Sequence, residues 1–495
     1  MNFSRTKFYK PALLALAACL FFAVFQVERL MNHDREALGL TRVTPLKNAP
    51  PVLAFTTVAL GGFRGLISNA LWIRANDLQE EDKMFEAVQL ADWITKLEPH
   101  FGQVWFFQAW NMAYNISVKF SDPADRWRWV RRGMVLLRDD GLEWNPDETL
   151  LYRELSWIFQ HKMGNNLDDA HTYYKTAWAG EMQEVLKGRP DYPELLNPQT
   201  DEAKARVKRL RSEYKMDPQL MKEVDELYGP LEWRLPDAHA IYWAEKGRRI
   251  AKKEDQETLR RSIYQTMQMA FMRGGFSENK IDKTFTLGPN LDLMEKANHT
   301  YEMMMEDDPS KRDLVKTGHK NFLLTGVYFL YTGNREKEAA KWFAYLQEKY
   351  PQAVLDANKR KMSLDEFAIA QMMGDVTETD SIKTTQAIMG LLTSKYYQLA
   401  LDDESASLNY ANMAQKVWSR YTAEVKGTGD RIALKPMVEL NRVVREKLFD
   451  PENSMFSPQM IAQLRSRLGE SAPTNAPATN AAPVEPTPPA APVKK

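Results

Sequence analysis

Apolar residues recur along most of the chain at spacings of three and four positions, which places them on one face of an α-helix. A clear example is the run Phe85, Val88, Ala91, Ile94 and Leu97. The alternation typical of half-buried strands is nearly absent, and residues 284–290 (TFTLGPN) form the longest stretch of the body without helical spacing. The pattern therefore predicts an all-α fold.

The longest uninterrupted apolar run lies near the start of the chain, over residues 11–27. As a helix it would be roughly 25 Å long, near the lower limit for crossing a bilayer. The basic residues Arg5, Lys7 and Lys10 precede it, and basic flanks favour the cytoplasmic side. We therefore expect a single-pass helix in the cytoplasmic membrane, with the N-terminus inside and the body extracytoplasmic.

Two other interpretations of this run also place the body in the cell envelope. Residues 16–19 (LAAC) resemble the lipobox of bacterial lipoproteins, in which Cys19 would carry the lipid, and a cleaved signal peptide is the other alternative. A second apolar segment, Val52 to Ile73, contains one charge, Arg64. It is compatible with another membrane pass or with an amphipathic helix that lies on the first repeat or on the bilayer.

Residues 321–351 combine helical spacing with the period of a helix pair. Small and apolar residues lie on both sides of a turn, Thr332 to Asn334, where two helices must cross at close range. They are Leu323, Gly326, Leu330, Ala339, Phe343, Leu346 and Pro351. The segment resembles the tetratricopeptide repeat family, and its ending EKYPQA is similar to repeats of periplasmic helical scaffold proteins. The resemblance implies an α-solenoid built from helix pairs.

Other segments match this pattern less completely. They are 75–99, a segment with Ala170, Tyr174 and Ala177, a longer pair between Trp105 and Pro146, and a pair over 383–400 and 404–421. We expect six regions: an anchor (1–30), a linker (31–51), a helical region with repeats (52–215), an irregular helical region (216–310), a second region with repeats (311–468) and a disordered Pro- and Ala-rich tail (469–495).

Charge and composition argue against several classes of protein. The chain has 66 basic and 66 acidic residues, so no global attraction to nucleic acid is expected. Its single cysteine excludes an intramolecular disulfide, and its 7 histidines show no zinc-binding spacing. Catalytic motifs are absent, and His239 has no nucleophile or acid at a diagnostic spacing. We expect no enzyme activity, cofactor, metal or small-molecule substrate.

Two clusters have both a structural and a functional interpretation. The stripe RWRWVRR could bind rings or headgroups through Arg126, Arg128, Arg131 and Arg132, or could form a helix with tryptophans inward and arginines in solvent. The aromatic set over 105–114 could line a peptide groove or fill the core. It contains Trp105, Phe106, Phe107, Trp110 and Tyr114.

The leading hypothesis is an extracytoplasmic scaffold, resembling tetratricopeptide repeats, that binds another envelope or membrane protein. The alternative is an envelope hydrolase on a helical toroid that acts on glycan or peptide. If the first helix of each pair lines a concave face, five residues are expected to contact the partner. They are Trp105, Gln108, Asn111, Lys320 and Tyr328.

Overall fold

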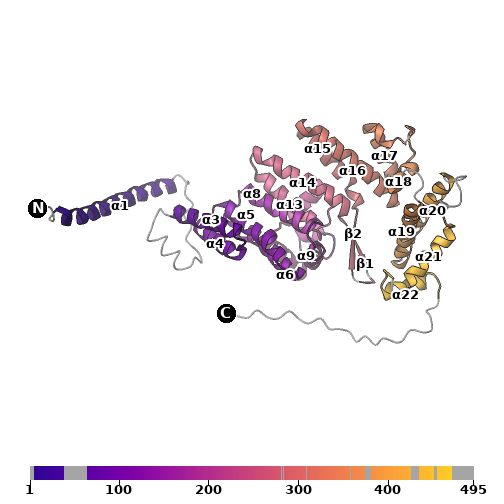
Figure 1. The fold of residues 1–495 in the computed structure, drawn as a ribbon, viewed down its shortest axis with the longest axis horizontal. Helices are drawn as coiled ribbons and strands as arrows, with labels where there is room; N and C mark the ends of the chain where they lie inside the picture. Colours follow the sequence, from indigo (N-terminus) through magenta and orange to yellow (C-terminus); the bar gives the residue numbers. More distant parts are fainter. Residues whose placement is uncertain are drawn as a thin grey trace, which may run out of the picture. The chain divides into compact units, whose positions relative to one another are not determined.

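The computed structural model describes residues 5–37, 64–279, 281–282, 284–307, 309–356, 358–373, 381–424, 434–450 and 454–470. The described chain is almost entirely helical, which confirms the predicted all-α class, and it is compatible with a helical solenoid (Figure 1). It divides into two compact units. Unit 1 contains residues 1–276 and 287–319, and unit 2 contains residues 277–286 and 320–495.

Helix α1 (Arg5–Ala37) contains the predicted anchor and continues into the predicted linker, whose remaining residues lie outside the described part. Large apolar side chains of α1 are more than half exposed, among them five within residues 20–25. In the described parts of the chain, no helix reaches the length and apolar character that crossing a membrane requires. Residues 52–63 and the tail from 471 onward also lie outside the described part.

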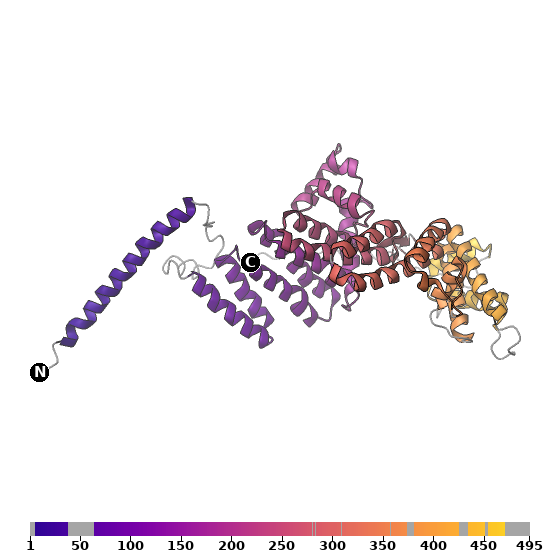
Figure 2. The same cartoon turned by 90° about the horizontal axis from the view of Figure 1, so that it is seen from above.

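Unit 1 is a succession of packed helices, several of which lie side by side in Figure 2. Its first part comprises α3 (Arg64–Glu80), α4 (Met84–Leu97), α5 (Gly102–Trp110), η2 (Asn111–Ile116), η3 (Ser117–Lys119), α6 (Pro123–Val135), η4 (Leu136–Gly141), α7 (Leu142–Trp144), α8 (Thr149–Trp157), η5 (Ile158–Gly164) and α9 (His171–Leu186). Its second part comprises α10 (Tyr192–Leu196), α11 (Asp201–Ser212), α12 (Pro218–Tyr228), α13 (Pro236–Ile250), α14 (Lys253–Arg273), η6 (Leu291–Leu293), α15 (Met294–Asp307) and η7 (Pro309–Lys311).

Three of these segments, η2, η4 and η5, are π-helices that continue α5, α6 and α8 without a break. A π-helix bonds each residue to the fifth along the chain rather than the fourth, so its turn is wider. Side chains four positions apart therefore lie almost in line along the helix axis. This local geometry positions the aromatic rings described below.

Close helix crossings in unit 1 depend on small residues, as the sequence pattern predicts in general. A Cβ at Gly133 of α6 would lie 2.7 Å from the carbonyl oxygen of Ala109, and one at Gly247 of α13 would lie 2.6 Å from Tyr152 Cβ. Large aromatic side chains fill the space beside these crossings. Trp178, Trp233, Trp243, Tyr174, Tyr242 and Phe159 are all fully buried.

Helix α16 (Arg312–Thr332) and α17 (Glu336–Lys349) form the helix pair predicted from the 321–351 pattern. Leu323, Leu330, Ala339 and Leu346 are fully buried, and Asn334 in the turn has a left-handed φ of 61°. Helices α19 (Ser381–Ala400) and α20 (Glu404–Glu424) form the pair predicted over 383–400 and 404–421. The remaining elements of unit 2 are η8 (Pro351–Val354), α18 (Leu364–Met373), α21 (Met437–Phe449) and α22 (Pro458–Arg467).

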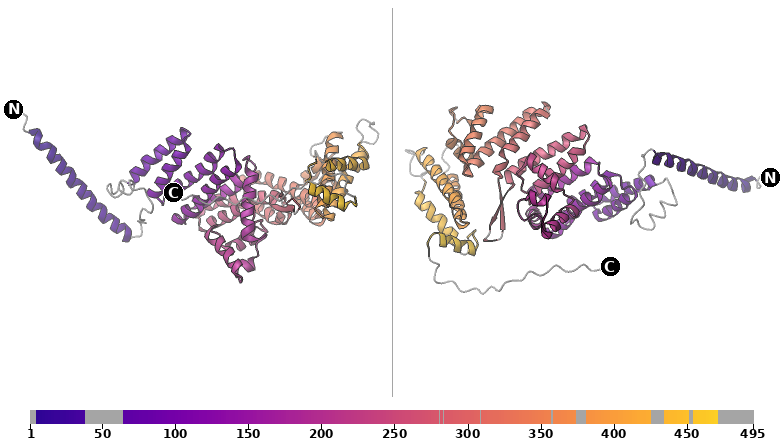
Figure 3. Two further views of the ribbon diagram at one scale, coloured as in Figure 1. Left: turned by 90° about the horizontal axis from the view of Figure 1, so that it is seen from below. Right: turned by 180° about the vertical axis from the view of Figure 1, so that it is seen from behind.

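The non-helical segment predicted at 284–290 is also confirmed. Residues Thr284–Gly288 form strand β2, which pairs with β1 (Gly275–Asn279) in a two-stranded sheet (Figure 3). The chain passes between the two units within these strands and again after His319, inside α16. The six predicted regions are not tested by this division and remain a prediction.

Candidate functional site

The most distinctive concave surface of unit 1 lies between α5, the continuous helix α8–η5, and α14. We name it the aromatic groove, and its volume is about 360 Å³. Its lining residues are Phe106, Trp110, Arg153, Glu154, Trp157, Gln160, Thr258, Arg261, Ser262 and Gln265. Helix α5 packs against α8, and α8 packs against α14, so all three walls come from neighbouring helices.

Half-buried rings continue from the groove along both of its first two helices. Trp110 stacks on Tyr114 with ring centroids 4.2 Å apart, and Trp157 stacks on His161 at 4.6 Å. Both pairs are four residues apart and cross from an α-helix into a π-helix, which brings their rings nearly into register. Phe106 lies edge-on to Trp110 at 5.7 Å, and Tyr114 connects the two helices through His161 at 5.8 Å. The result is a continuous aromatic row.

A buried hydrogen-bond acceptor also lines the groove. Gln160 is 2 % exposed, and its Oε1 atom has no hydrogen-bond partner. Leaving a buried polar atom unpaired costs about 1–3 kcal/mol. Such a cost is explained if a ligand supplies the missing donor, because buried polar groups in folded proteins are almost always paired.

The charged side chains of the groove are already paired. Arg153 donates to Glu154 Oε1 from Nε at 2.9 Å, and Arg261 donates to Glu257 at 2.7 Å. Burial raises the pKa of the Glu154 carboxyl, and the hydrogen bond from Arg153 offsets only part of that rise. Glu154 is the one carboxylate among the lining residues, whereas glycoside hydrolysis ordinarily uses two.

The aromatic row is electrically neutral near pH 7. Burial and the neighbouring Lys162 ammonium lower the pKa of His161, so its ring is uncharged there. Burial likewise raises the pKa of the Tyr114 hydroxyl. The Lys162 ammonium lies 5.2 Å from the Tyr114 ring centroid and is held 2.6 Å from Asp168.

Three of the residues expected to contact a partner are not exposed. Trp105, Gln108 and Asn111 are 5 %, 2 % and 0 % exposed, so the expectation that they line the surface is wrong. Trp105 points into the core and donates from Nε1 to the carbonyl of Pro99 at 2.8 Å. The half-buried positions Phe106 and Trp110 of the same helix line the groove instead. A contact with a partner at Lys320 and Tyr328, which are half-buried, remains a prediction.

Most residues of the arginine stripe fit the structural interpretation, in which the tryptophans point inward and the arginines lie in solvent. Trp127 is buried, whereas Arg128, Arg131 and Arg132 are exposed. Arg126 differs because its side chain is only 12 % exposed and lies 3.5 Å from Asp168. Arg131 pairs with Glu181 at 3.3 Å. Most of this stripe is therefore a solvated helix face over buried tryptophan.

A second groove, in unit 2, is lined mostly by residues with polar side chains, and its volume is about 440 Å³. We name it the amide groove, and its lining residues are Tyr331, Asn334, Glu336, Ser405, Leu408, Asn409, Asn412, Met413, Gln415 and Lys416. Lys416 donates to the Tyr331 hydroxyl at 2.6 Å and to Asp365 at 2.9 Å. Among the described residues, no side chain of the amide groove has a buried polar atom without a hydrogen-bond partner. This groove therefore has no counterpart of the unpaired Gln160.

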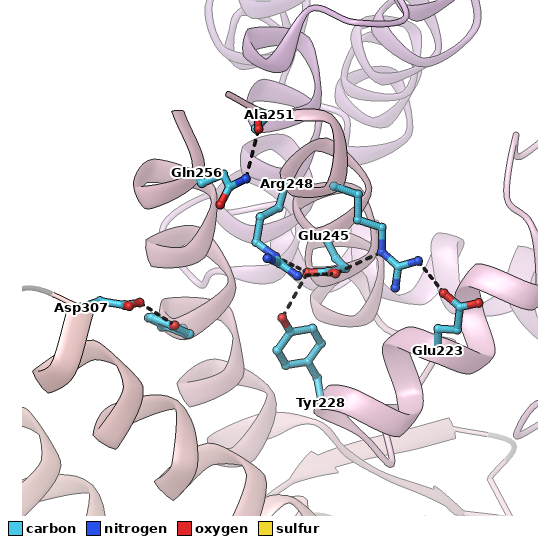
Figure 4. A network of polar contacts seen from close by, with 9 residues as sticks. Glu223, Tyr228, Glu245, Arg248, Ala251, Gln256 and Asp307 are labelled. Atoms are coloured by element: carbon cyan, nitrogen blue, oxygen red, sulfur yellow. Dashed lines mark hydrogen bonds and ion pairs between the residues drawn. The ribbon is translucent and has the colours of Figure 1, made fainter. Parts of the chain in front are cut away.

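A buried carboxylate network in unit 1 has a structural explanation. Glu245 of α13 is fully buried and accepts hydrogen bonds from Arg248 at 2.7 and 2.8 Å, Arg249 at 3.1 Å and Tyr228 at 3.1 Å (Figure 4). Because both oxygens are fully used, this cluster holds α12 against α13 rather than offering a reactive group.

His239 is part of the core. It is fully buried, and its Nε2 donates to the carbonyl of Trp233 at 2.8 Å, which places the proton on that nitrogen. Over the described residues, no group of three or more acidic, histidine or cysteine side chains could hold a metal ion. No protein-family model matches the chain, and a search of curated proteins finds no matching sequence.

Proposed function

We propose that the protein is a binding scaffold of helix pairs, resembling tetratricopeptide repeats, that holds another protein of the cell envelope in the aromatic groove. The observation that carries this proposal is the continuous row of half-buried rings beside the unpaired Oε1 of Gln160. Tryptophan and tyrosine supply large contact area with few rotatable bonds, and they are enriched where binding energy concentrates.

The neighbouring walls support a macromolecular partner. Helix α14 contributes Thr258, Arg261 and Gln265 on one exposed face, opposite the rings of α5 and α8. A surface with aromatic residues at its centre and hydrogen-bonding groups at its edge matches the anatomy of protein interfaces.

We further propose that α1 holds the scaffold at the cytoplasmic membrane with its body outside. Support comes from residues 20–25, in which apolar side chains on consecutive positions are all exposed. Consecutive helical positions lie about 100° apart, so these side chains cover every side of α1. A helix that is apolar all round is ordinarily surrounded by lipid or by other protein.

The groove can be tested by placing a photo-crosslinking residue at Gln265, which is exposed and lines it, in cells that express the full chain. Gln219 is an exposed glutamine of α12 outside the lining set and is the matched control. We expect a discrete crosslinked protein from position 265 and none from 219, and we expect Trp157→Ala to abolish the crosslink from 265. Equal crosslinking from both positions, or no effect of Trp157→Ala, would contradict the proposal.

A further inference from the structure

We infer that the occupant of the aromatic groove is an extended, uncharged, proline-rich segment of polypeptide, an inference that rests on the proposed function. Trp110 and Trp157 are each stacked on one side, against Tyr114 and His161, and both line the groove. Prolines in an extended segment pack their flat rings on such aromatic surfaces, and the segment is already in its bound conformation before it docks.

The spacing of polar groups on the facing helix fits such a segment. Thr258, Arg261 and Gln265 project from α14 over seven residues, a distance of about 10 Å along the helix axis. A polyproline II segment rises about 3.1 Å per residue and repeats every three residues, or about 9 Å. Its carbonyl groups have no internal hydrogen bonds, so the Thr258 hydroxyl and the Gln265 amide, about one such repeat apart, can donate to carbonyls on neighbouring turns.

Gln160 adds a requirement that a run of prolines alone cannot meet. Its buried Oε1 needs a donor, and proline has no backbone N–H. The segment must therefore place at least one other residue between its prolines, with the N–H of that residue directed at Gln160.

Charge complementarity selects an uncharged segment. Arg153 is bonded to Glu154, and Arg261 is bonded to Glu257, so each arginine beside the groove already has a carboxylate. An acidic segment would compete with Glu154 and Glu257 for the two arginines, and a basic segment would be repelled by the arginines. A neutral segment disturbs neither pair.

The chain itself provides a suitable probe. Residues 473–493 (PTNAPATNAAPVEPTPPAAPV) contain prolines interleaved with alanine, threonine and asparagine and a single charge, and they lie outside the described residues. A synthetic peptide of this sequence can be compared with one in which alanine replaces every proline.

The test titrates both peptides into the full chain by calorimetry. We expect the proline peptide to bind, the alanine peptide to bind at least about tenfold more weakly, and Trp157→Ala to lose about tenfold or more in affinity. Trp144→Ala, at a half-buried tryptophan outside the groove, is the control and should leave the affinity unchanged. In parallel, a photo-crosslinker at Gln265 should capture a proline-rich segment, either the added peptide or the same sequence of the chain.

Three outcomes would overturn the inference. They are equal affinity for the two peptides, crosslinks only to segments without proline, and binding of a chito-oligosaccharide in place of the peptide with the same dependence on Trp157. If the cellular crosslink from Gln265 still depends on Trp157 but the proline peptide does not compete with it, the scaffold function stands and this inference fails.

Discussion

Single residues determine how closely the helices of unit 1 approach. Gly247 lets α13 cross α8 where any Cβ would lie 2.6 Å from Tyr152 Cβ. We expect Gly247→Ala to destabilise the protein by about 1–3 kcal/mol, because the two helices must separate. Gly180→Ala is the control: that glycine is exposed in α9 with no atom within 4 Å of the added Cβ, so the substitution should stabilise by about 0.5–1 kcal/mol. Urea unfolding measures both, and equal effects would refute the steric explanation.

His239 makes stability depend on pH. Burial lowers its pKa to about 4, from an ordinary value of 6.5. The unfolded chain therefore binds a proton first as the pH falls, so stability is complete above about pH 6.5 and declines from there towards pH 4. We expect a loss on the order of 1 kcal/mol between about pH 7.5 and pH 5.5. His239→Gln should remove this slope, whereas His299→Gln, at an exposed histidine, should retain it.

At the scale of elements, the turn between α16 and α17 depends on a left-handed residue. Asn334 has a φ of 61°, a conformation that costs other L-residues about 1–2 kcal/mol. We expect Asn334→Ala to destabilise unit 2 by about 1 kcal/mol and Asn334→Gly to be neutral or slightly stabilising. Thermal unfolding distinguishes these cases. If glycine and alanine had the same effect, backbone conformation would not be the cause.

Helix pairs could be predicted from sequence because apolar spacing and turn residues are local signals. The pair around Asn334 and the pair joined at Asp402 both follow that pattern. The exposed face of the helix over 104–117 could not be predicted, because almost every side of it carries an apolar or amide residue. Such a sequence is equally consistent with Trp105 at the surface and Trp110 in the core, which is the reverse of the observed arrangement. The unpaired Gln160 leaves no sequence signal, because its surroundings come from other helices. In the network around Glu245, the pairs with Arg248 and Arg249 are local, at i+3 and i+4 on one helix, whereas the contact with Tyr228 comes from α12 and leaves no such signal.

At the scale of the whole molecule, we expect α1 to determine whether the protein is associated with the membrane. Replacing Phe21 and Phe22 by aspartate should release the protein into the soluble fraction, because each acidic residue costs about 2.5–3.5 kcal/mol at the centre of a bilayer. Cys19→Ser should leave membrane association unchanged if the apolar surface alone holds the chain. Fractionation after alkaline extraction measures both, and release by Cys19→Ser would establish the lipoprotein alternative.

Orientation is a separate prediction. The basic residues before the apolar run favour a cytoplasmic N-terminus, so a reporter fused after Lys495 should be active only outside the cytoplasm. The same reporter fused before Met1 should be inactive, because it would remain in the cytoplasm. Activity of the C-terminal fusion in the cytoplasm would refute this topology.

The π-helical segments of α5, α6 and α8 have a consequence for how this protein can change over evolution. Each segment accommodates one more residue than an α-helix would need, so deleting a single residue there would restore the regular helix and remove the wide turn that aligns the side chains within the segment. Such a deletion would hardly change the amino-acid composition, yet it would move the ring of Tyr114 or His161 out of the aromatic row. Substitutions can therefore change the groove gradually. Deletions in the π-helical segments of α5 and α8 would instead disrupt the aromatic row in one step, so we expect the lengths of these two helices to be retained as long as the groove is functional.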